Sequence, residues 1–281
     1  MIIDFHTHTF PDAMAVKTVE FLKSKSGTVP FSDGTVKGLS EKAKAAGVEL
    51  SIVLPVITNP ASTAKINRFA AAQNESAKET GVFSFGGMHP DVADIKGAIK
   101  EIRDLGLKGL KIHPAYQKTP LNDIKYKRII GYAEETGLIV VSHGGLDIGV
   151  DGSWSSPQMA AELIDDVKPE RLVLAHMGGW EQWQDVKNYL CGKKVYFDTA
   201  FCAVDFAYQS EFPADRQKPV LSERDFTEIV KLHGADKILF GTDSPWGDEK
   251  TQVDFINGLN LSPAEKSAIF FGNAQKLLGN I

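Results

Sequence analysis

The chain has 281 residues, of which 43% are hydrophobic and 24% are charged. This balance is typical of a soluble globular protein with enough apolar material for a sizeable core. The formal net charge is −5, and no basic cluster is present. Nucleic acid and anionic membrane surfaces are therefore not expected as partners.

Cysteine usage and the first residues indicate a reducing compartment. The cysteines are Cys191 and Cys202, so no disulfide framework is indicated. The N-terminal residues lack the basic segment and following apolar segment of a secretory signal. No apolar run approaches the roughly 18–20 residues of a membrane span. We therefore expect a cytoplasmic protein that does not enter membranes.

Eight short segments rich in apolar and β-branched residues predict strands, over residues 2–8, 50–56, 82–88, 107–113, 138–143, 171–176, 194–199 and 237–242. Apolar residues near helical spacing predict helices between most of them. These helices are expected over residues 13–25, 41–46, 67–80, 95–105, 125–136, 156–167 and 223–233. The stretch 26–40, with three glycines, is expected to be a loop.

The strand–helix alternation predicts an α/β fold, specifically a (β/α)8 TIM barrel formed by residues 1–281 as a single domain. An open doubly wound sheet would need a glycine-rich turn after the first strand. The sequence there is His-Thr-His-Thr-Phe-Pro. The long connections 11–49 and 200–236 are expected at the carboxyl ends of the strands, where loops form the pocket of such barrels.

Two histidines one residue apart end the first predicted strand. Side chains alternate between the two faces of a strand, so His6 and His8 are expected to share a face. Two imidazoles on one face can bind one metal ion. The alternative is a strand cap and a satisfied core histidine, and the short motif alone does not decide between them.

Chemically active side chains also end other predicted strands, namely Lys111 and His113, His143, His176, and Asp243. Because the carboxyl ends of barrel strands converge on one mouth, these groups are expected to meet there. Histidines that only fill a core would not favour one end of so many strands. The joint pattern indicates an active site that takes a small-molecule substrate.

The motifs resemble those of the amidohydrolase superfamily, in the branch that includes aminocarboxymuconate-semialdehyde decarboxylase and γ-resorcylate decarboxylase. The matching segments are Asp-Phe-His-Thr-His at 4–8, Gly-Leu-Lys-Ile-His-Pro at 109–114, Ser-His-Gly-Gly at 142–145, Leu-Ala-His-Met-Gly-Gly at 174–179, Leu-Phe-Gly-Thr-Asp-Ser-Pro at 239–245 and Phe-Gly-Asn-Ala-Gln-Lys-Leu-Leu-Gly at 271–279. The resemblance spans essentially the whole chain and supports the barrel prediction.

The resemblance implies that His6, His8, His143 and Asp243 bind a metal ion. Three imidazoles and one carboxylate suit Zn²⁺ and leave a position open for water. It further implies that Asp243 accepts a proton from that water and that His176 acts as an acid, base or electrostatic group. One Zn²⁺ is the favoured prediction, and Mn²⁺ is an alternative.

Lys111 leaves the number of metal ions open. Superfamily members with two metals use a carboxylated lysine on this strand as a bridge, and His143 and His176 would then bind the second ion. Alternatively, Lys111 is an ammonium group that orients a substrate carboxylate or pairs with an acid. His113, which precedes Pro114, is either a substrate contact or a structural cap.

Aromatic residues follow several predicted strands and are expected around the pocket mouth, where packing is the alternative role. They are Trp154, Trp180, Tyr208 and Trp246. His89 is expected to be structural. His233 is expected at a helix C-terminus, where the helix dipole favours a positive charge.

Three functions remain open at this point. A metal-dependent hydrolase acting on an amide, ester or lactone is the first prediction. A metal-dependent, non-oxidative decarboxylase of a planar carboxylic acid is the second. The third is a metal-binding barrel without activity, although structural zinc sites are usually closed and often contain cysteine. The sequence is compatible with a homo-oligomer.

Overall fold

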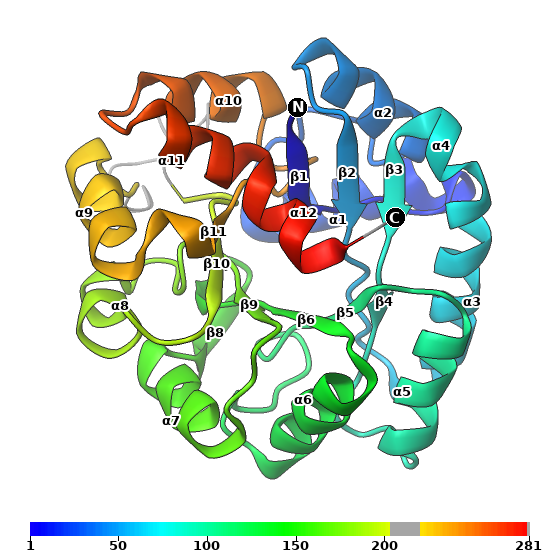
Figure 1. Ribbon diagram of the computed structural model, residues 1–281. Helices are drawn as coiled ribbons and strands as arrows, with labels where there is room; N and C mark the ends of the chain where they lie inside the picture. Colours follow the sequence, from blue (N-terminus) through cyan, green and yellow to red (C-terminus); the bar gives the residue numbers. More distant parts are fainter. Residues whose placement is uncertain (203–219, 280–281) are drawn as a thin grey trace.

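The computed structural model describes residues 1–202 and 220–279. Parallel strands form the centre of the molecule and helices surround them (Figure 1). The strands are β1 (Ile3–Thr7), β2 (Leu50–Val53), β3 (Val82–Ser84), β4 (Gly86–Gly87), β5 (Gly109–Ile112), β6 (Ile139–Ser142), β9 (Leu172–Leu174), β10 (Tyr196–Asp198) and β11 (Ile238–Leu239). Every predicted strand is present in shortened form, and the third is divided at Phe85 into β3 and β4.

The strands follow one another in barrel order. One set of parallel pairs joins β1 to β2 and β2 to β3, and a second runs from β4 through β5, β6, β9 and β10 to β11. Hydrogen bonds between β1 and the β11 segment connect the two outer ends. The Phe5 N–H donates to the Phe240 carbonyl at 2.8 Å, and the Asp243 N–H donates to the His6 carbonyl at 2.8 Å. The chain therefore forms a TIM barrel, as predicted.

A β-bulge shapes the end of β1. The partners Asp4–Ser51 and Thr7–Val53 leave one extra residue on β1, which turns His6 out of the regular ladder. The Asp4 carboxylate accepts the His6 N–H at 3.1 Å and the Thr242 hydroxyl at 2.6 Å. One buried acid thus holds both strands that carry the candidate metal ligands.

The described helices are α1 (Asp12–Ser26), α2 (Val36–Ala45), α3 (Thr63–Gln73), α4 (Ala77–Thr80), α5 (Ile95–Asp104), α6 (Ile124–Thr136), α7 (Pro157–Val167), α8 (Trp183–Tyr189), α9 (Glu223–His233), α10 (Glu249–Gly258), α11 (Pro263–Ser267) and α12 (Asn273–Leu278). Side-chain caps explain several starts. The Ser156 hydroxyl caps α7, and Ser262 with Glu265 forms a capping box on α11. None of the described helices is both long and apolar enough to cross a membrane.

Several details differ from the sequence prediction, and α8, α10, α11 and α12 were not among the expected helices. The second helix begins at Val36 instead of residue 41, because the Thr35 hydroxyl accepts the Gly38 N–H and starts the helix within the expected loop. The predicted helix 67–80 is divided into α3 and α4 by a 3₁₀ turn over Asn74–Ser76. An antiparallel hairpin, β7 (Gly145–Asp147) with β8 (Val150–Ser155), follows β6 and was not predicted.

Two layers of apolar side chains form the core. Alternate strand positions such as Phe5, Phe85 and Val141 face the barrel interior, and Leu277 of α12 closes one end of that layer. The other strand face packs on the surrounding helices through residues such as Ile112. The period-two alternation of a strand produces both layers, and it leaves the polar residues at the carboxyl ends of the strands to form the site.

Candidate metal centre and active site

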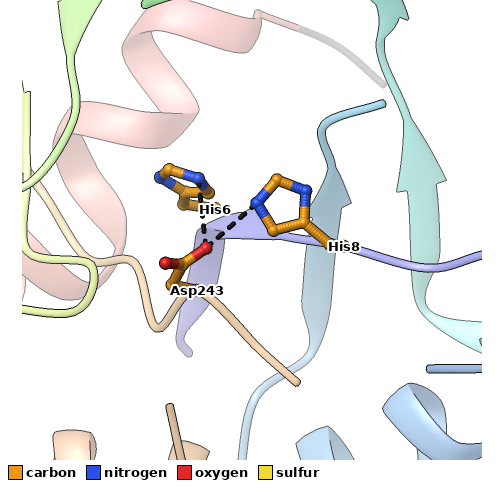
Figure 2. Close-up of side chains that lie close together, drawn as sticks. All are labelled: His6, His8 and Asp243. Atoms are coloured by element: carbon orange, nitrogen blue, oxygen red, sulfur yellow. Dashed lines mark ion pairs between the residues drawn. The ribbon is translucent and has the colours of Figure 1, made fainter. Parts of the chain in front are cut away.

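His6, His8 and Asp243 converge at the mouth of the barrel (Figure 2). The Nε2 atoms of His6 and His8 lie 3.5 Å and 3.0 Å from the Asp243 Oδ1. One ligand atom from each residue lies within 4.8 Å of the other two. Residues from β1 and from the segment after β11 therefore come together as the sequence predicts.

The outer nitrogens of these histidines fix where their protons lie. The His8 Nδ1 faces the Leu54 carbonyl at 2.8 Å, and the His6 Nδ1 faces the Asp198 carboxylate at 2.9 Å. Both partners only accept hydrogen bonds, so each Nδ1 carries the proton and each Nε2 presents a lone pair. Two lone pairs and a carboxylate oxygen then face one another, an arrangement that a cation would stabilise. This set fits a divalent metal ion.

Asp198 supports two of the candidate catalytic residues. Its Oδ2 accepts from His6, and its Oδ1 accepts the backbone N–H of His176 at 2.9 Å. Burial alone would raise the pKa of Asp198, but the contact with His6 lowers it to about 2. The carboxylate therefore stays ionised and keeps the His6 ring in one orientation.

Lys111 lies directly beside the first group of ligands. Its Nζ is 3.2 Å from the His6 Nε2, and the side chain is buried. Burial lowers the pKa of Lys111 to about 8, against the opposing attraction of Asp198 and Asp243. Both alternatives from the sequence, a carboxylated bridge and an orienting ammonium, place this side chain at the centre of the site.

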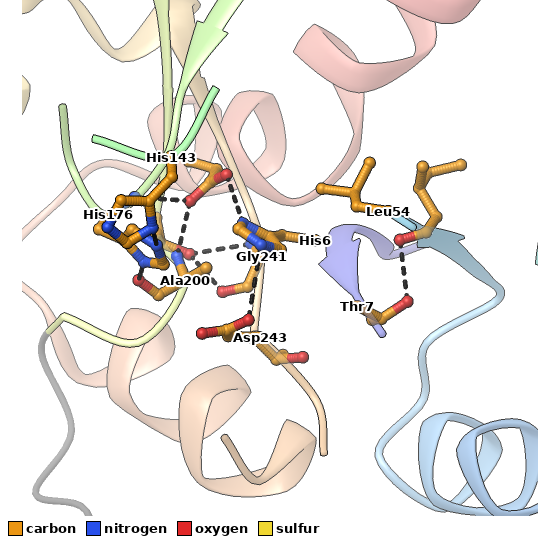
Figure 3. Close-up of polar contacts among 12 residues, drawn as sticks. His6, Thr7, Leu54, His143, His176, Ala200, Gly241 and Asp243 are labelled. Atoms are coloured by element: carbon orange, nitrogen blue, oxygen red, sulfur yellow. Dashed lines mark hydrogen bonds and ion pairs between the residues drawn. The ribbon is translucent and has the colours of Figure 1, made fainter. Parts of the chain in front are cut away.

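His176 faces His143 rather than solvent (Figure 3). The His176 Nδ1 donates to the Ala200 carbonyl at 2.9 Å, so its Nε2 presents a lone pair. This Nε2 lies 3.0 Å from the His143 Nδ1, and the His6 and His176 rings are 5.3 Å apart. Burial, followed by the proximity of His143, lowers the pKa of His176 to about 3. His176 is therefore uncharged at neutral pH, with its Nε2 unprotonated.

His143 belongs to a second group, with His113 and Asp147. The His113 Nε2 and the His143 Nε2 lie 3.5 Å and 4.0 Å from the Asp147 Oδ2. The rings of Tyr116, His113 and His143 stack at 4.2 Å and 4.3 Å. The structure thus places His143 beside the group of His6, His8 and Asp243 without including it, and its predicted role as a ligand there stays a prediction.

Asp243 and His176 share a feature of backbone conformation. Their φ angles are +65° and +61°, in the left-handed region that non-glycine residues rarely adopt. Such strain persists only where surrounding contacts impose it, and it is common at active sites. Burial alone would raise the pKa of Asp243, but His6 and His8 hold it below its usual range. Asp243 is therefore ionised at neutral pH.

Asp147 and Asp198 were missed by the sequence reasoning. Asp198 ends β10 inside a predicted strand, so a search for carboxylates at every strand end would have found it. Asp147 lies on the unpredicted hairpin. That hairpin is held in place where Gly145, at φ +85°, approaches the backbone of Trp180, whose N–H donates to the Gly144 carbonyl at 2.9 Å. A side chain at Gly145 would collide with that backbone.

The aromatic residues predicted to line the pocket lie in different environments. Trp154 lies on β8 and donates to the Asp151 carbonyl, whereas Trp180 is buried in the larger hydrophobic cluster and Trp246 packs against it. Tyr208 lies outside the described residues.

The two remaining histidines have structural positions. His89 accepts the Asp91 N–H, in keeping with a structural role. His233 ends α9 as predicted, but it is buried and burial lowers its pKa to about 4. The expected positive charge at this helix end is therefore wrong.

Comparison with known sequences identifies the family of this chain. The sequence model of the amidohydrolase family matches residues 3–279. The chain belongs to the amidohydrolase family. It is therefore an enzyme of a family that uses divalent metal ions. No curated protein matches this sequence.

Solved structures of similar fold cover nearly the whole amidohydrolase chain. An uncharacterised TIM-barrel protein from Bordetella bronchiseptica has 19% identity and a TM-score of 0.76, over 99% of this chain and 98% of its own. A dihydroxybenzoic acid decarboxylase from Polaromonas, with bound manganese and the inhibitor 2-nitroresorcinol, has 15% identity and a TM-score of 0.68, over 99% and 96%. The 5-carboxyvanillate decarboxylase LigW from Sphingomonas paucimobilis has 17% identity and a TM-score of 0.63, over 99% and 98%. These TM-scores show the shared fold.

Proposed function

We propose that this amidohydrolase is a metal-dependent hydrolase that cleaves an amide, ester or lactone bond of a small molecule. The proposal places residues 1–281 in one cytoplasmic domain. His6, His8 and Asp243, with His143 as the predicted fourth ligand, would hold one divalent ion. Zn²⁺ and Mn²⁺ are both compatible with the imidazole and carboxylate ligands. When bound, such an ion polarises a carbonyl group and lowers the pKa of a coordinated water.

The orientation of the proton-transfer groups supports hydrolysis. The His176 N–H is committed to the Ala200 carbonyl, so the Nε2 of this ring accepts protons. The Asp243 carboxylate, beside His6 and His8, is also an acceptor. Hydrolysis requires a group that takes a proton from water. Decarboxylation requires a group that delivers a proton to carbon, which neither residue offers in this arrangement.

Asp198 and Lys111 would act around this centre. Asp198 holds the His6 ring so that its Nε2 points toward Asp243. Lys111 brings a cationic donor to the same nitrogen, 3.2 Å away. In the proposed reaction, Asp198 preserves the ligand geometry and Lys111 orients a substrate oxygen. The Lys111 role depends on its remaining uncarboxylated, so one metal ion per chain is expected.

A decarboxylase is the second candidate, because two of the similar structures are decarboxylases of aromatic acids. In that reaction, His176 or Asp243 would have to be protonated before transferring a proton to the ring carbon.

The test is a paired screen of the metal-loaded enzyme. Amides, esters and lactones would be followed by proton release, and planar hydroxy acids by CO₂ release. We expect hydrolysis of at least one carbonyl substrate and its loss in Asp243→Asn. CO₂ release from the acids without any hydrolysis would replace the hydrolase proposal by the decarboxylase.

A further inference from the structure

Asp147 and His113 form a pair that the proposed reaction does not use. The Asp147 Oδ2 and the His113 Nε2 lie 3.5 Å apart, and their side chains are 8% and 7% exposed. They come from different connections, Asp147 from the β7–β8 hairpin and His113 from the end of β5. Both therefore keep a small accessible surface beside His143 at the mouth of the barrel.

The contacts of His113 fix its proton on the nitrogen that faces Asp147. The Tyr116 N–H points at the His113 Nδ1 at 3.4 Å, so the Nδ1 is the acceptor of that ring. In the neutral imidazole the Nε2 then carries the hydrogen. The Gln117 side chain accepts the His113 backbone N–H at 3.0 Å and donates to the Ile57 and Met88 carbonyls. The Gln117 side chain thus ties the backbone of His113 to the segments that follow β2 and β4.

Asp147 supplies an acceptor beside that donor. Its Oδ1 accepts the Gly149 N–H at 2.8 Å, within the hairpin turn. The Val150 N–H also hydrogen-bonds to this carboxylate. The Oδ2 faces the His113 Nε2 at 3.5 Å, a separation longer than a usual N–H···O hydrogen bond. The pair therefore presents one N–H donor and one carboxylate acceptor side by side, each able to bond to a ligand.

A metal ion is the competing occupant, because ligand atoms of His113, His143 and Asp147 lie within 4.8 Å of one another. The proton positions argue against it. A metal ion in this group would need a lone pair on the His113 Nε2. Because the Nδ1 accepts the Tyr116 N–H, the hydrogen of the neutral ring lies on the Nε2 instead. The His143 Nε2 also lies 2.7 Å from the Leu146 carbonyl, an acceptor that favours a proton on that nitrogen. This contrasts with His6 and His8, whose lone pairs face their carboxylate.

We propose that Asp147 and His113 form a recognition site for a carboxamide, lactam or ureide group. His113 would donate to the carbonyl oxygen, and Asp147 would accept from the N–H next to it. An ester or lactone lacks that N–H and would leave the Asp147 oxygen unpaired, which disfavours binding. This inference rests on the proposed hydrolase function and narrows its substrate class to amides.

The test compares two probes of the same shape, benzamide and benzoate, on the metal-loaded full chain. Their dissociation constants would be measured by calorimetry for the wild type, Asp147→Asn and Asp147→Ala. Asp151→Asn is the matched control, because it removes the same charge from the exposed part of the same hairpin. A bound ion contributes equally to binding in all the chains. A change in the ratio of the benzamide and benzoate dissociation constants therefore reports the effect of Asp147.

We expect the wild type and Asp151→Asn to prefer benzamide. Asp147→Asn can present two donors together with His113, so it should weaken benzamide binding about tenfold or more and strengthen benzoate binding. Asp147→Ala should weaken benzamide without strengthening benzoate. Binding is measured without turnover, so a changed ratio in a chain that hydrolyses nothing would support this site and refute the proposed function.

Three results would overturn the inference. Equal weakening of both probes, accompanied by a lower melting temperature in both variants, would assign Asp147 a structural role. Loss of a metal ion from Asp147→Asn, measured by elemental analysis, would assign the group to metal binding. Failure of the wild type to bind benzamide more tightly than benzoate would remove the site as a selector of amides.

Discussion

The barrel mouth contains two groups of the same composition, two histidines and one aspartate, whose chemistry differs. In the first, the N–H groups of His6 and His8 point away from Asp243, toward Asp198 and Leu54. In the second, the N–H on the His113 Nε2 lies beside the Asp147 Oδ2, at a separation of 3.5 Å between the two heavy atoms. The first group therefore offers lone pairs to a cation, and the second offers a donor beside an acceptor. Residue type alone does not define a metal site, because the proton on the far nitrogen decides what each imidazole can bind.

The two groups also differ in what carries their aspartate. Asp243 follows a barrel strand and hydrogen-bonds through its backbone to His6 at 2.8 Å. Asp147 lies on a hairpin that is joined to the barrel through Gly144 and Trp180. Sites on strands are held more closely than sites on loops. A carboxylate that is held by a strand suits metal binding and proton transfer, which depend on precise distances. The sequence of a hairpin can change without disturbing the barrel.

Replacing one histidine in each group should give the largest contrast. His8→Ala removes a lone pair from the first group and should abolish metal binding at neutral pH. His113→Ala removes a donor from the second group and should leave metal content unchanged. Elemental analysis after dialysis against Zn²⁺ would measure both. Equal loss from the two variants would mean that both groups bind metal.

Asp243→Asn should separate binding from catalysis within the first group. The amide oxygen can still face the ion, but it no longer accepts a proton efficiently. We expect turnover to fall by about 10²–10⁴-fold, the contribution of a positioned general base. The metal content should remain near that of the wild type. Near-normal turnover on a substrate found in the screen would remove Asp243 from proton transfer.

His233 is a buried histidine that belongs to neither group. Its Nε2 faces the Val195 carbonyl at 2.8 Å and its Nδ1 accepts the Gly192 N–H at 3.3 Å, so both nitrogens are satisfied without a ligand. Burial lowers its pKa from 6.5 to about 4. Between pH 6.5 and about 4 the unfolded chain binds more protons at this residue than the folded chain does. The contribution of neutral His233 to the free energy of unfolding is therefore complete above pH 6.5 and is lost as the pH falls toward 4.

His233→Gln should flatten this pH dependence. The lowered pKa corresponds to at most about 3 kcal/mol of unfolding free energy across that range. Urea unfolding at several pH values would compare the slopes of the two chains, whatever their absolute stabilities. Parallel slopes for the wild type and the variant would show that His233 does not titrate on unfolding.

Asp198→Asn should lower the metal affinity of the first group without abolishing it. The amide holds the His6 ring less firmly and makes the imidazole a poorer ligand. We expect the affinity for Zn²⁺ to fall by about 10–100-fold, as for other partners of metal-binding histidines. Competition with a chelator would measure this change. An unchanged affinity would mean that the His6 orientation depends on the barrel alone.

The sequence predicted the site where the relevant residues end regular strands. His6, His8, His143, His176 and Asp243 follow that rule, because the carboxyl ends of parallel strands meet at one rim. The spacing of His6 and His8 predicted a shared face. In the structure, a β-bulge in β1 accompanies the contact of both histidines with Asp243. An extra residue in one strand leaves no mark on an apolar pattern, so this detail could not be predicted.

The division of the histidines between two groups was beyond the sequence as well. It depends on Asp147, which lies on a hairpin without a strong strand pattern, and on backbone carbonyls such as Leu54 and Ala200. Every residue has a carbonyl, so composition cannot indicate which one will face an imidazole. The helix at Val36 was missed for a related reason, since its start depends on one hydroxyl of Thr35.

The bonds between β1 and the β11 segment join parts of the chain that are far apart in sequence. Asp4 and Thr242 are separated by 238 positions. During synthesis, β1 must therefore wait unpaired on this side until the β11 segment has left the ribosome, and contacts of such long range slow folding. Binding of a metal ion by residues from β1 and from the β11 segment would then report that the barrel has closed.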